Sequence, residues 1–569
     1  MTQAVTKYLR WTPAEIMLAI LFLLASLYYH PNLGGEGLRI PHNITIWLVA
    51  TIFISYSFLK VLKTREYVLP KYLWMIAAFP ILATLSGFIA GVEQPLKWLF
   101  RLLFIWGGLA FFFALFQARL SQARVDRLLF IIVISALIFS VIGLMQIWLK
   151  LDMPFFLPKS EKGIPTSLFQ QINNMATYQV TAIMISVYLS TRPAFRRINL
   201  RSWVLIIATL LAAFIVGVSG SRIGTLTLII SLTVVLPVVV TKLNKNKVSQ
   251  ALLLAVVIGF FGGANMPGGD RLVDKARAMQ SGYSGEARLG MYAISMGLIA
   301  ESPLVGHGIG SFGPAWQFAK PEFYTENPEA KLLTKYVSHP HNEIIQWLVE
   351  GGVIAFIGMV LVVIGVILAG VKTSTNRAIL SAGMLLPMAL HTQVELPFYM
   401  SVIHWFVFII IIYSLLNHKT NVKQIGITKA AINLTRLTVV SVTSLLIVFY
   451  AHTLRANWDF VFYYQGEQMD TPLPYAYKNP YLGDQARWID LSAILYSSIQ
   501  SGLPDNVRYY TVWGEELKAS QPDVDLFIKL VDAYEFLGDK TNYCSNAHQA
   551  LLLYPEETRF QNAVEFCKY

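Results

Sequence analysis

Residues 127–149 read RLLFIIVISALIFSVIGLMQIWL, an arginine followed by an apolar run without further charge. A helix that crosses the hydrocarbon core of a bilayer needs roughly 17–25 mostly apolar residues, so this run predicts a membrane-spanning helix. Outward from it, the same criterion finds twelve more runs, at residues 13–30, 44–62, 70–91, 97–117, 172–191, 202–219, 222–241, 248–264, 343–369, 377–398, 400–417 and 434–452. The sequence therefore predicts an all-α polytopic membrane protein with about 13 transmembrane helices.

The composition of the 569 residues agrees with this prediction. Hydrophobic residues make up 55% of the chain and charged residues 14%, with a mean hydropathy of +0.53. Ordinary soluble domains carry about 25% charged residues, so this chain has too few charges to cover a set of water-facing surfaces. The same numbers exclude disordered, collagen-like, coiled-coil and cysteine-rich secreted proteins. The net charge of +12 lies mainly in short loops, so we expect no nucleic-acid partner.

The lysines and arginines of the short loops predict the orientation, because cytoplasmic loops carry an excess of them. Every second short loop is basic: one set holds 22 such residues and the alternate set holds seven. The N-terminus is therefore predicted to be cytoplasmic and the C-terminus to lie outside. This gives helices 1–9 in residues 1–264, an exported loop in 265–342, helices 10–13 in 343–452 and an exported tail in 453–569.

The exported tail is polar and rich in aromatic residues, and from Pro522 its pattern predicts helices separated at residues 538–539 and 554–555. It resembles a tetratricopeptide unit, with a plain helical hairpin as the alternative. Cys544 opens the second of these helices and Cys567 closes the third. An antiparallel hairpin would bring the two together, and disulfides persist outside the cytoplasm. We therefore expect a Cys544–Cys567 disulfide.

The densest polar cluster is the sequence Ser-His-Pro-His-Asn-Glu at residues 338–343, at the predicted outer boundary of a span. A histidine titrates near neutral pH and can accept a proton from a hydroxyl nucleophile. A zinc site would need a third ligand, which the spacing does not provide. The cluster therefore predicts acid–base chemistry, and the alternative is that it only caps the helix that follows.

Two arginines are candidates for binding phosphate. Arg222 follows Ser219-Gly220-Ser221 at an outward-facing membrane boundary, against the positive-inside bias. A charge at such a place is costly and indicates function, and the guanidinium suits phosphate oxygens. The alternative is that Arg222 snorkels to lipid head groups. Arg288, in the exported loop, is either a second phosphate ligand or the ion-pair partner of Glu286.

Further polar groups lie on the same predicted side of the membrane. They are the sequence HTQVELP at residues 391–397, which contains Glu395, and Gln171 and Asn174 at the start of the run 172–191. A transporter would more often place polar groups near the bilayer midplane, in paired repeats. No such repeat is visible. The placement favours a reaction at the outer leaflet between a phosphorylated lipid and an exported acceptor.

The ordered set of these residues resembles the O-antigen ligase superfamily over roughly residues 165–370. The matching segments are residues 219–222 (SGSR), 287–289 (ARL), 303–312 (PLVGHGIGSF), His341-Asn342 and Gly352. Within the superfamily, the chain is most similar to the bacterial protein O-oligosaccharyltransferases that glycosylate pilins. Two features carry that similarity, the segment 391–397 and the soluble tail after the last span.

The resemblance implies transfer of a glycan from undecaprenyl pyrophosphate to a Ser or Thr hydroxyl of an exported, pilin-like protein. It implies a multi-pass protein of a Gram-negative inner membrane, with its active site and its tail in the periplasm. Arg222 and Arg288 match the family's pyrophosphate-binding arginines, and His341 matches its essential histidine, with His339 as an alternative base and Asn342 in support. Further supporting roles are expected for Ser221, Tyr292, His307, Glu395, Gln171 and Asn174.

We expect an inverting transfer that needs no metal and no cofactor. A helical tail offers grooves for peptides, so the tail is expected to recognise the protein acceptor, with a stabilising lid as the alternative. The second candidate function is an O-antigen ligase or polymerase with a glycan or lipopolysaccharide acceptor. A lipid or polysaccharide transporter and a structural scaffold are the remaining alternatives.

Overall fold

The computed structural model describes residues 11–243, 246–267, 285–330, 336–417, 420–466 and 471–568. The chain forms two compact units, each assembled from separate segments. The first unit comprises Met1–Ala77, Trp106–Ala276 and Leu361–Gln465, and the second comprises Ala78–Ile105, Arg277–Val360 and Gly466–Tyr569. Each unit therefore combines residues that lie hundreds of positions apart in the sequence.

Each of the thirteen predicted runs contains a helix. These helices are α2 (Pro13–Leu23), α3 (Pro41–Thr64), α4 (Leu73–Ala90), α5 (Pro95–Gln117), α6 (Gln122–Leu149), α7 (Ile172–Ser190), α8 (Leu200–Ser219), α9 (Arg222–Leu243), α10 (Lys247–Ala264), α14 (Glu343–Val371), α15 (Thr375–His391), α17 (Val402–Leu416) and α18 (Lys429–Tyr464). Among the described residues, nine of them are long and apolar enough to cross a membrane, namely α3 to α6, α8 to α10, α14 and α18. The chain is thus a multi-pass membrane protein, and any span beyond these nine stays a prediction.

Three predicted runs differ most in extent from their helices. The run 13–30 is too long, because α2 ends at Leu23. The run 377–398 was too long, because α15 ends at His391 and a turn leads to the short helix α16 (Pro397–Met400), which begins at a proline. The helix in the last run is longer than the predicted run, because α18 continues to Tyr464. Short 3₁₀ helices occupy several connections: η1 (Ala25–Leu27), η2 (Gly37–Arg39), η3 (Lys150–Asp152) and η4 (Ser167–Phe169).

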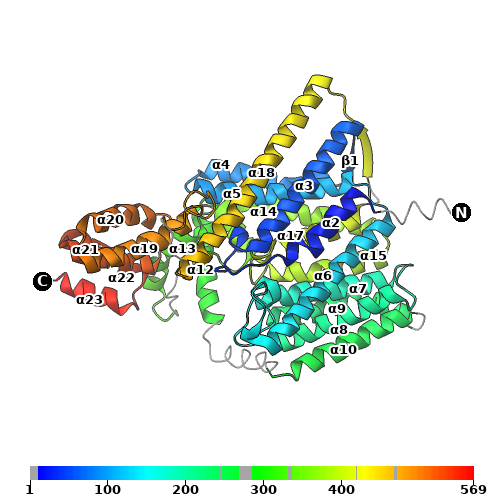
Figure 1. The fold of residues 1–569 in the computed structure, drawn as a ribbon, viewed down its shortest axis with the longest axis horizontal. Coiled ribbons are helices and arrows are strands. Elements are labelled where there is room, and N and C mark those ends of the chain that lie inside the picture. The colour runs from blue at the N-terminus through cyan, green and yellow to red at the C-terminus, as the bar shows by residue number, and fades with distance from the viewer. Residues whose placement is uncertain are drawn as a thin grey trace. The chain divides into compact units, whose positions relative to one another are not determined.

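In the first unit, α7, α8, α9 and α10 are neighbouring helices, and α18 runs alongside α3 (Figure 1). Glycines allow α8 and α10 to approach closely, as is common between membrane helices. A Cβ atom on Gly263 would lie 2.1 Å from the Phe214 carbonyl oxygen, and one on Gly217 would lie 2.2 Å from that of Phe260. The backbones of the two helices therefore touch where these glycines lie.

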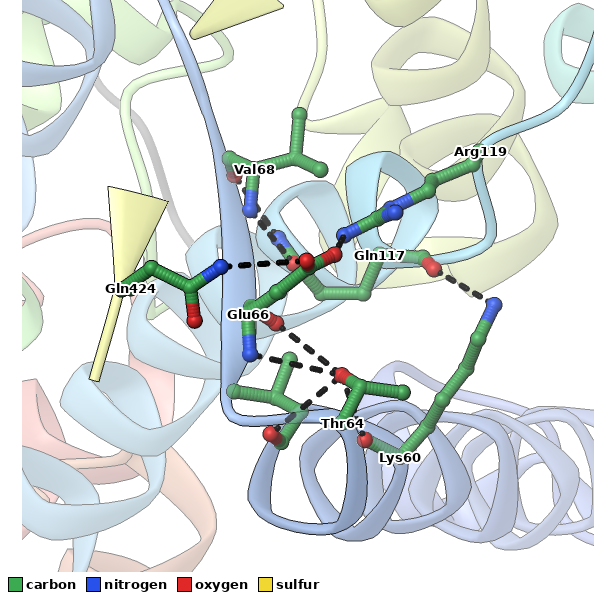
Figure 2. A network of polar contacts seen from close by, with 8 residues as sticks. Lys60, Thr64, Glu66, Val68, Gln117, Arg119 and Gln424 are labelled. Atoms are coloured by element: carbon green, nitrogen blue, oxygen red, sulfur yellow. Dashed lines mark hydrogen bonds and ion pairs between the residues drawn. The ribbon is translucent and has the colours of Figure 1, made fainter. Parts of the chain in front are cut away.

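A small sheet departs from the all-α prediction. Strand β1 (Glu66–Pro70) pairs antiparallel with β2 (Thr420–Gln424), with Glu66 opposite Gln424. Figure 2 shows the polar contacts around it: Arg119 Nη2 lies 2.7 Å from the Glu66 carboxylate, and the Gln117 amide bonds both backbone groups of Val68 at 2.8 Å. The strands join two short loops far apart in the sequence. Neither strand has the alternating apolar pattern that would have predicted it.

The second unit contains α12 (Gly285–Glu301), α13 (Phe312–Glu326) and the tail helices α19 (Gly483–Ser501), α20 (Pro504–Lys518), α21 (Val524–Leu537), α22 (Lys540–Leu553) and α23 (Thr558–Phe566). The tail helices α19 to α23 lie together (Figure 1), and their buried side chains form one apolar core. Gly538, at a φ of 67°, ends α21, and Asp539 caps α22, as the sequence predicted. Cys544 and Cys567 form a disulfide between α22 and α23, with their Cα atoms 5.8 Å apart.

The tail packs against α13 of the loop that precedes α14. The side-chain amide of Gln317 donates to the Leu553 carbonyl at 3.4 Å. The Lys320 ammonium lies 4.7 Å from the centre of the Tyr554 ring. Both α13 side chains are buried, so the turn after α22 covers this face of α13.

Candidate active site

The predicted histidine cluster lies at the start of α14, in the second unit. His341 has a φ of 52°, in the left-handed region that few residues other than glycine adopt. Asn342 follows and caps the helix, because its side-chain oxygen accepts a hydrogen bond from the Ile345 amide at 3.0 Å. The rings of His339 and His341 are 4.4 Å apart, edge to face, and both are partly exposed. The structure therefore brings both candidate bases together on a helix N-terminus.

The pair of imidazoles supplies two of the three or four ligands that zinc takes in proteins. This is a reason to test for a metal. It does not by itself make a metal site.

Arg288 and Tyr292 lie one turn apart on α12 and are both partly buried. Tyr292 packs against an apolar cluster that includes Met291 and Trp316. The indole nitrogen of Trp316, on α13, donates to the Met291 carbonyl at 3.1 Å. The helix with the candidate phosphate ligand Arg288 is thus fixed to α13. The side chain of Glu286, the alternative ion-pair partner, lies outside the described residues.

The segment 303–308 packs into an interruption of α14, which the sequence did not predict. Gly352 is non-helical, with φ 60° and ψ −166°. The Val353 amide donates instead to Pro303 at 2.8 Å, and the His307 amide donates to the Val349 carbonyl at 2.8 Å. The His307 ring nitrogen Nε2 donates to the Leu298 carbonyl at 2.8 Å. His307 therefore connects α12 to the interrupted helix.

In the first unit, Gly220, at a φ of 61°, ends α8, and Arg222 is the exposed first residue of α9. A helix N-terminus carries partial positive charge, so an arginine there is unfavourable for stability but well placed for an anion. The Ser221 hydroxyl accepts from the Gly224 amide at 3.1 Å and donates to the Asn173 side chain at 2.8 Å. Ser221 thus caps α9 and joins its start to the start of α7.

The other predicted residues of this unit lie on α7 and after α15. Gln171 caps α7 by accepting from the Asn174 amide at 3.2 Å, and the Asn174 side chain is buried. The Asn174 carbonyl accepts from His404 Nε2 at 2.9 Å. The Glu395 side chain is partly buried, and its backbone amide donates to the carbonyl of His391 at 3.1 Å.

Sequence reasoning missed one buried ion pair in the second unit. The guanidinium of Arg101, on α5, lies 2.7 Å from the carboxylate of Glu350, on α14. A signal was present, because Glu350 is an acidic residue inside a predicted span. A charge in a span is costly, so it is usually paired with another group and has a function.

Two family models match the chain. One, described as O-Antigen ligase, matches residues 207–360. The other, described as Virulence factor membrane-bound polymerase, C-terminal, matches residues 379–566. The first range contains Arg222, Arg288 and His341, and the second contains Glu395 and both cysteines. No match to a curated protein was found.

Proposed function

Because the chain belongs to the O-antigen ligase superfamily, we propose that it is a protein O-oligosaccharyltransferase. Members of this superfamily transfer glycans, so the chain is a multi-pass membrane protein with glycosyltransferase-type activity. The finer proposal is transfer of a whole oligosaccharide from undecaprenyl pyrophosphate to a Ser or Thr hydroxyl of an exported, pilin-like protein. The folded helical tail on α13 is the observation that carries this choice of acceptor, because such a domain suits a protein partner.

The proposed chemistry is an inverting displacement at the anomeric carbon of the donor sugar. The acceptor hydroxyl oxygen forms a new bond to the anomeric carbon. At the same time, the bond between the anomeric carbon and the pyrophosphate oxygen breaks. His341 takes the hydroxyl proton, with His339 as the alternative base and Asn342 in support. A general base of this kind contributes about 10²–10⁴ in rate. Arg222 and Arg288 each donate to oxygens of the departing pyrophosphate, where charge develops.

We place this reaction at the periplasmic face of a bacterial inner membrane, with the N-terminus in the cytoplasm. The lysine and arginine distribution supports this orientation. We propose no metal ion or cofactor. Transfer by the purified protein should survive an excess of chelator, and loss of transfer that a divalent ion restores would contradict the metal-free mechanism.

A second candidate is a ligase or polymerase with a glycan acceptor. It is favoured by the match of residues 379–566 to a model described as a membrane-bound polymerase. The two candidates differ in the product. Cells that make the lipid-linked donor should attach the glycan to a co-expressed exported pilin, as mass spectrometry of that pilin would show. Glycan appearing only on lipopolysaccharide, or as longer chains on the lipid, would favour the second candidate.

The tail is proposed to bind the protein acceptor, and exposed aromatic residues offer a test. Tyr509 on α20 is 65% exposed and Tyr496 on α19 is 43% exposed. Replacing both by alanine should raise the acceptor KM without lowering the melting temperature, because both side chains are exposed. Leu552→Ala on α22 is the matched control, because the Leu552 side chain is 66% exposed. An unchanged acceptor KM in the double variant, together with full transfer after deletion from residue 522, would contradict acceptor binding by the tail. The tail would then be a stabilising lid.

A further inference from the structure

The carboxylate of Glu350 is the meeting point of three elements in the second unit. It is 1% exposed, and one oxygen lies 2.7 Å from a guanidinium nitrogen of Arg101 on α5. The other oxygen accepts from the Gln346 side-chain amide at 3.3 Å and from the Phe312 backbone amide, the first of α13, at 3.4 Å. A buried carboxylate is costly unless it is paired, so this arrangement requires both the cation and the amides.

On one side, Glu350 is connected to the histidine cluster. The interruption at Gly352 makes residues 343–351 a short helical rod at the start of α14. Asn342, Gln346 and Glu350 are four residues apart and share a face of this rod. The Asn342 carbonyl accepts from the Gln346 amide at 3.0 Å, and Asn342 also caps the rod. The orientation of the rod therefore determines where the His341 ring lies.

On the other side, Glu350 is connected to the helix that holds Arg288. Its Phe312 contact lies at the start of α13, and α13 is bonded to α12 through Trp316 and Met291. Met291 follows Arg288 by three residues on α12. The Glu350 carboxylate thus links the element next to the candidate base, through its place in the 343–351 rod, to α13 and through α13 to the helix that carries Arg288.

We propose that Arg101 and Glu350 are positioning residues for glycan transfer. Their ion pair holds the 343–351 rod, and with it His341, in register with α13 and α12. Neither side chain touches reacting atoms in this proposal, which rests on the proposed function. A displacement of about 1 Å at a reacting group can cost about 10² in rate, so the loss is expected in kcat.

The kinetic test compares Glu350→Gln, Arg101→Gln and Arg101→Lys in the purified full-length protein. Glu350→Gln and Arg101→Gln should lower kcat by about 10²-fold, with little change in acceptor KM. Arg101→Lys keeps the positive charge and should retain most of the wild-type kcat. Asp459→Asn is the matched control, because it removes an ion pair of the same 2.7 Å length with a buried carboxylate, the one to Arg455 on α18. A kcat for Glu350→Gln equal to that of Asp459→Asn would overturn the proposal.

A distance measurement tests the positioning without relying on activity. Both cysteines of the chain are in the disulfide, so nitroxide labels can be attached to cysteines introduced at Glu322 on α13 and at Ser338, both exposed. Glu350→Gln should broaden the distance distribution between the labels, and Asp459→Asn should not. An unchanged distribution would overturn the positioning role, whatever the kinetics. Broadening in a protein that transfers no glycan would support the positioning and contradict the proposed function.

Discussion

Lys320 is a buried cation between the loop helix α13 and the tail. Burial is the main cause that lowers its pKa, to about 8, and the nearby Glu556 carboxylate opposes the shift. An unfolded lysine has a pKa of about 10.4, so the unfolded chain binds more protons between about pH 8 and pH 10. The free energy of unfolding should therefore rise with pH across this window, and the full cost of the buried charge applies below pH 8.

Replacing Lys320 by methionine should remove this pH dependence and raise stability at pH 7, by at most about 3 kcal/mol. Methionine keeps the length of the apolar stem and leaves no charge to bury. The check is thermal unfolding of the wild type and the variant at pH 7 and pH 9.5, with the exposed Lys568→Met as control. A variant that melts below the wild type at pH 7 would mean that the contact of the ammonium with Tyr554 outweighs its desolvation.

At the scale of the element, the interruption of α14 depends on two backbones that fit together. A Cβ atom on Gly352 would lie 2.3 Å from the Leu304 carbonyl oxygen, and the residue has a positive φ. Gly352→Ala should therefore destabilise the protein by more than about 1–3 kcal/mol, the cost of a backbone conformation that essentially only glycine adopts. Transfer should fall as well, because the rod with His341 would move.

Gly297→Ala is the matched control for this prediction. Gly297 lies inside α12, and nothing lies within 4 Å of a Cβ atom built there. Alanine in a helix is favoured over glycine by about 1 kcal/mol, so this variant should be neutral or more stable. Thermal melting of both variants is the measurement. Equal melting temperatures would show that the fit between Gly352 and Leu304 does not constrain α14.

The two interruptions among the helices show what could be predicted from sequence. The break at Gly220-Ser221-Arg222 has local signals, a glycine followed by a capping serine and a charge, and it was predicted. The break at Gly352 was not predicted, because the apolar run continues beyond Gly351 and Gly352 to residue 369. Its cause is tertiary: hydrogen bonds from residues 303–308 replace those of the helix. The pairing of β1 with β2 was missed for the same reason.

For the candidate site, the sequence predicted residue types and spacing but not how they are held. His341 and Asn342 do lie together with His339, and Ser221 and Arg222 do start a helix. The role of His307 as a connector depends on its contacts with other segments. The pair Arg101–Glu350 depends on a contact between residues more than 200 positions apart in the sequence. Such contacts leave no periodic signal, so only the cost of an acidic residue inside a span pointed to Glu350.

At the scale of the whole molecule, the disulfide joins α22 to the segment that follows α23, within the tail. Its two cysteines are 23 residues apart. Crosslinks of this kind typically contribute about 2–4 kcal/mol, so Cys544→Ala with Cys567→Ala should lower the melting temperature of the tail and increase its proteolysis. The membrane helices should melt as before. Thiol labelling of the wild type under non-reducing conditions should find no free cysteine, and labelling of both would contradict the disulfide.

The assigned base and acceptor are tested most directly by glycan transfer to an exported pilin in cells that make the lipid-linked donor, with the wild type compared with His341→Ala and His339→Ala. We expect glycosylated pilin with the wild type and none with His341→Ala at equal protein levels. Undiminished transfer by His341→Ala would contradict the assigned base and move it to His339 if that variant fails. Absence of pilin transfer by the wild type, with the glycan found on lipopolysaccharide, would contradict the proposed acceptor.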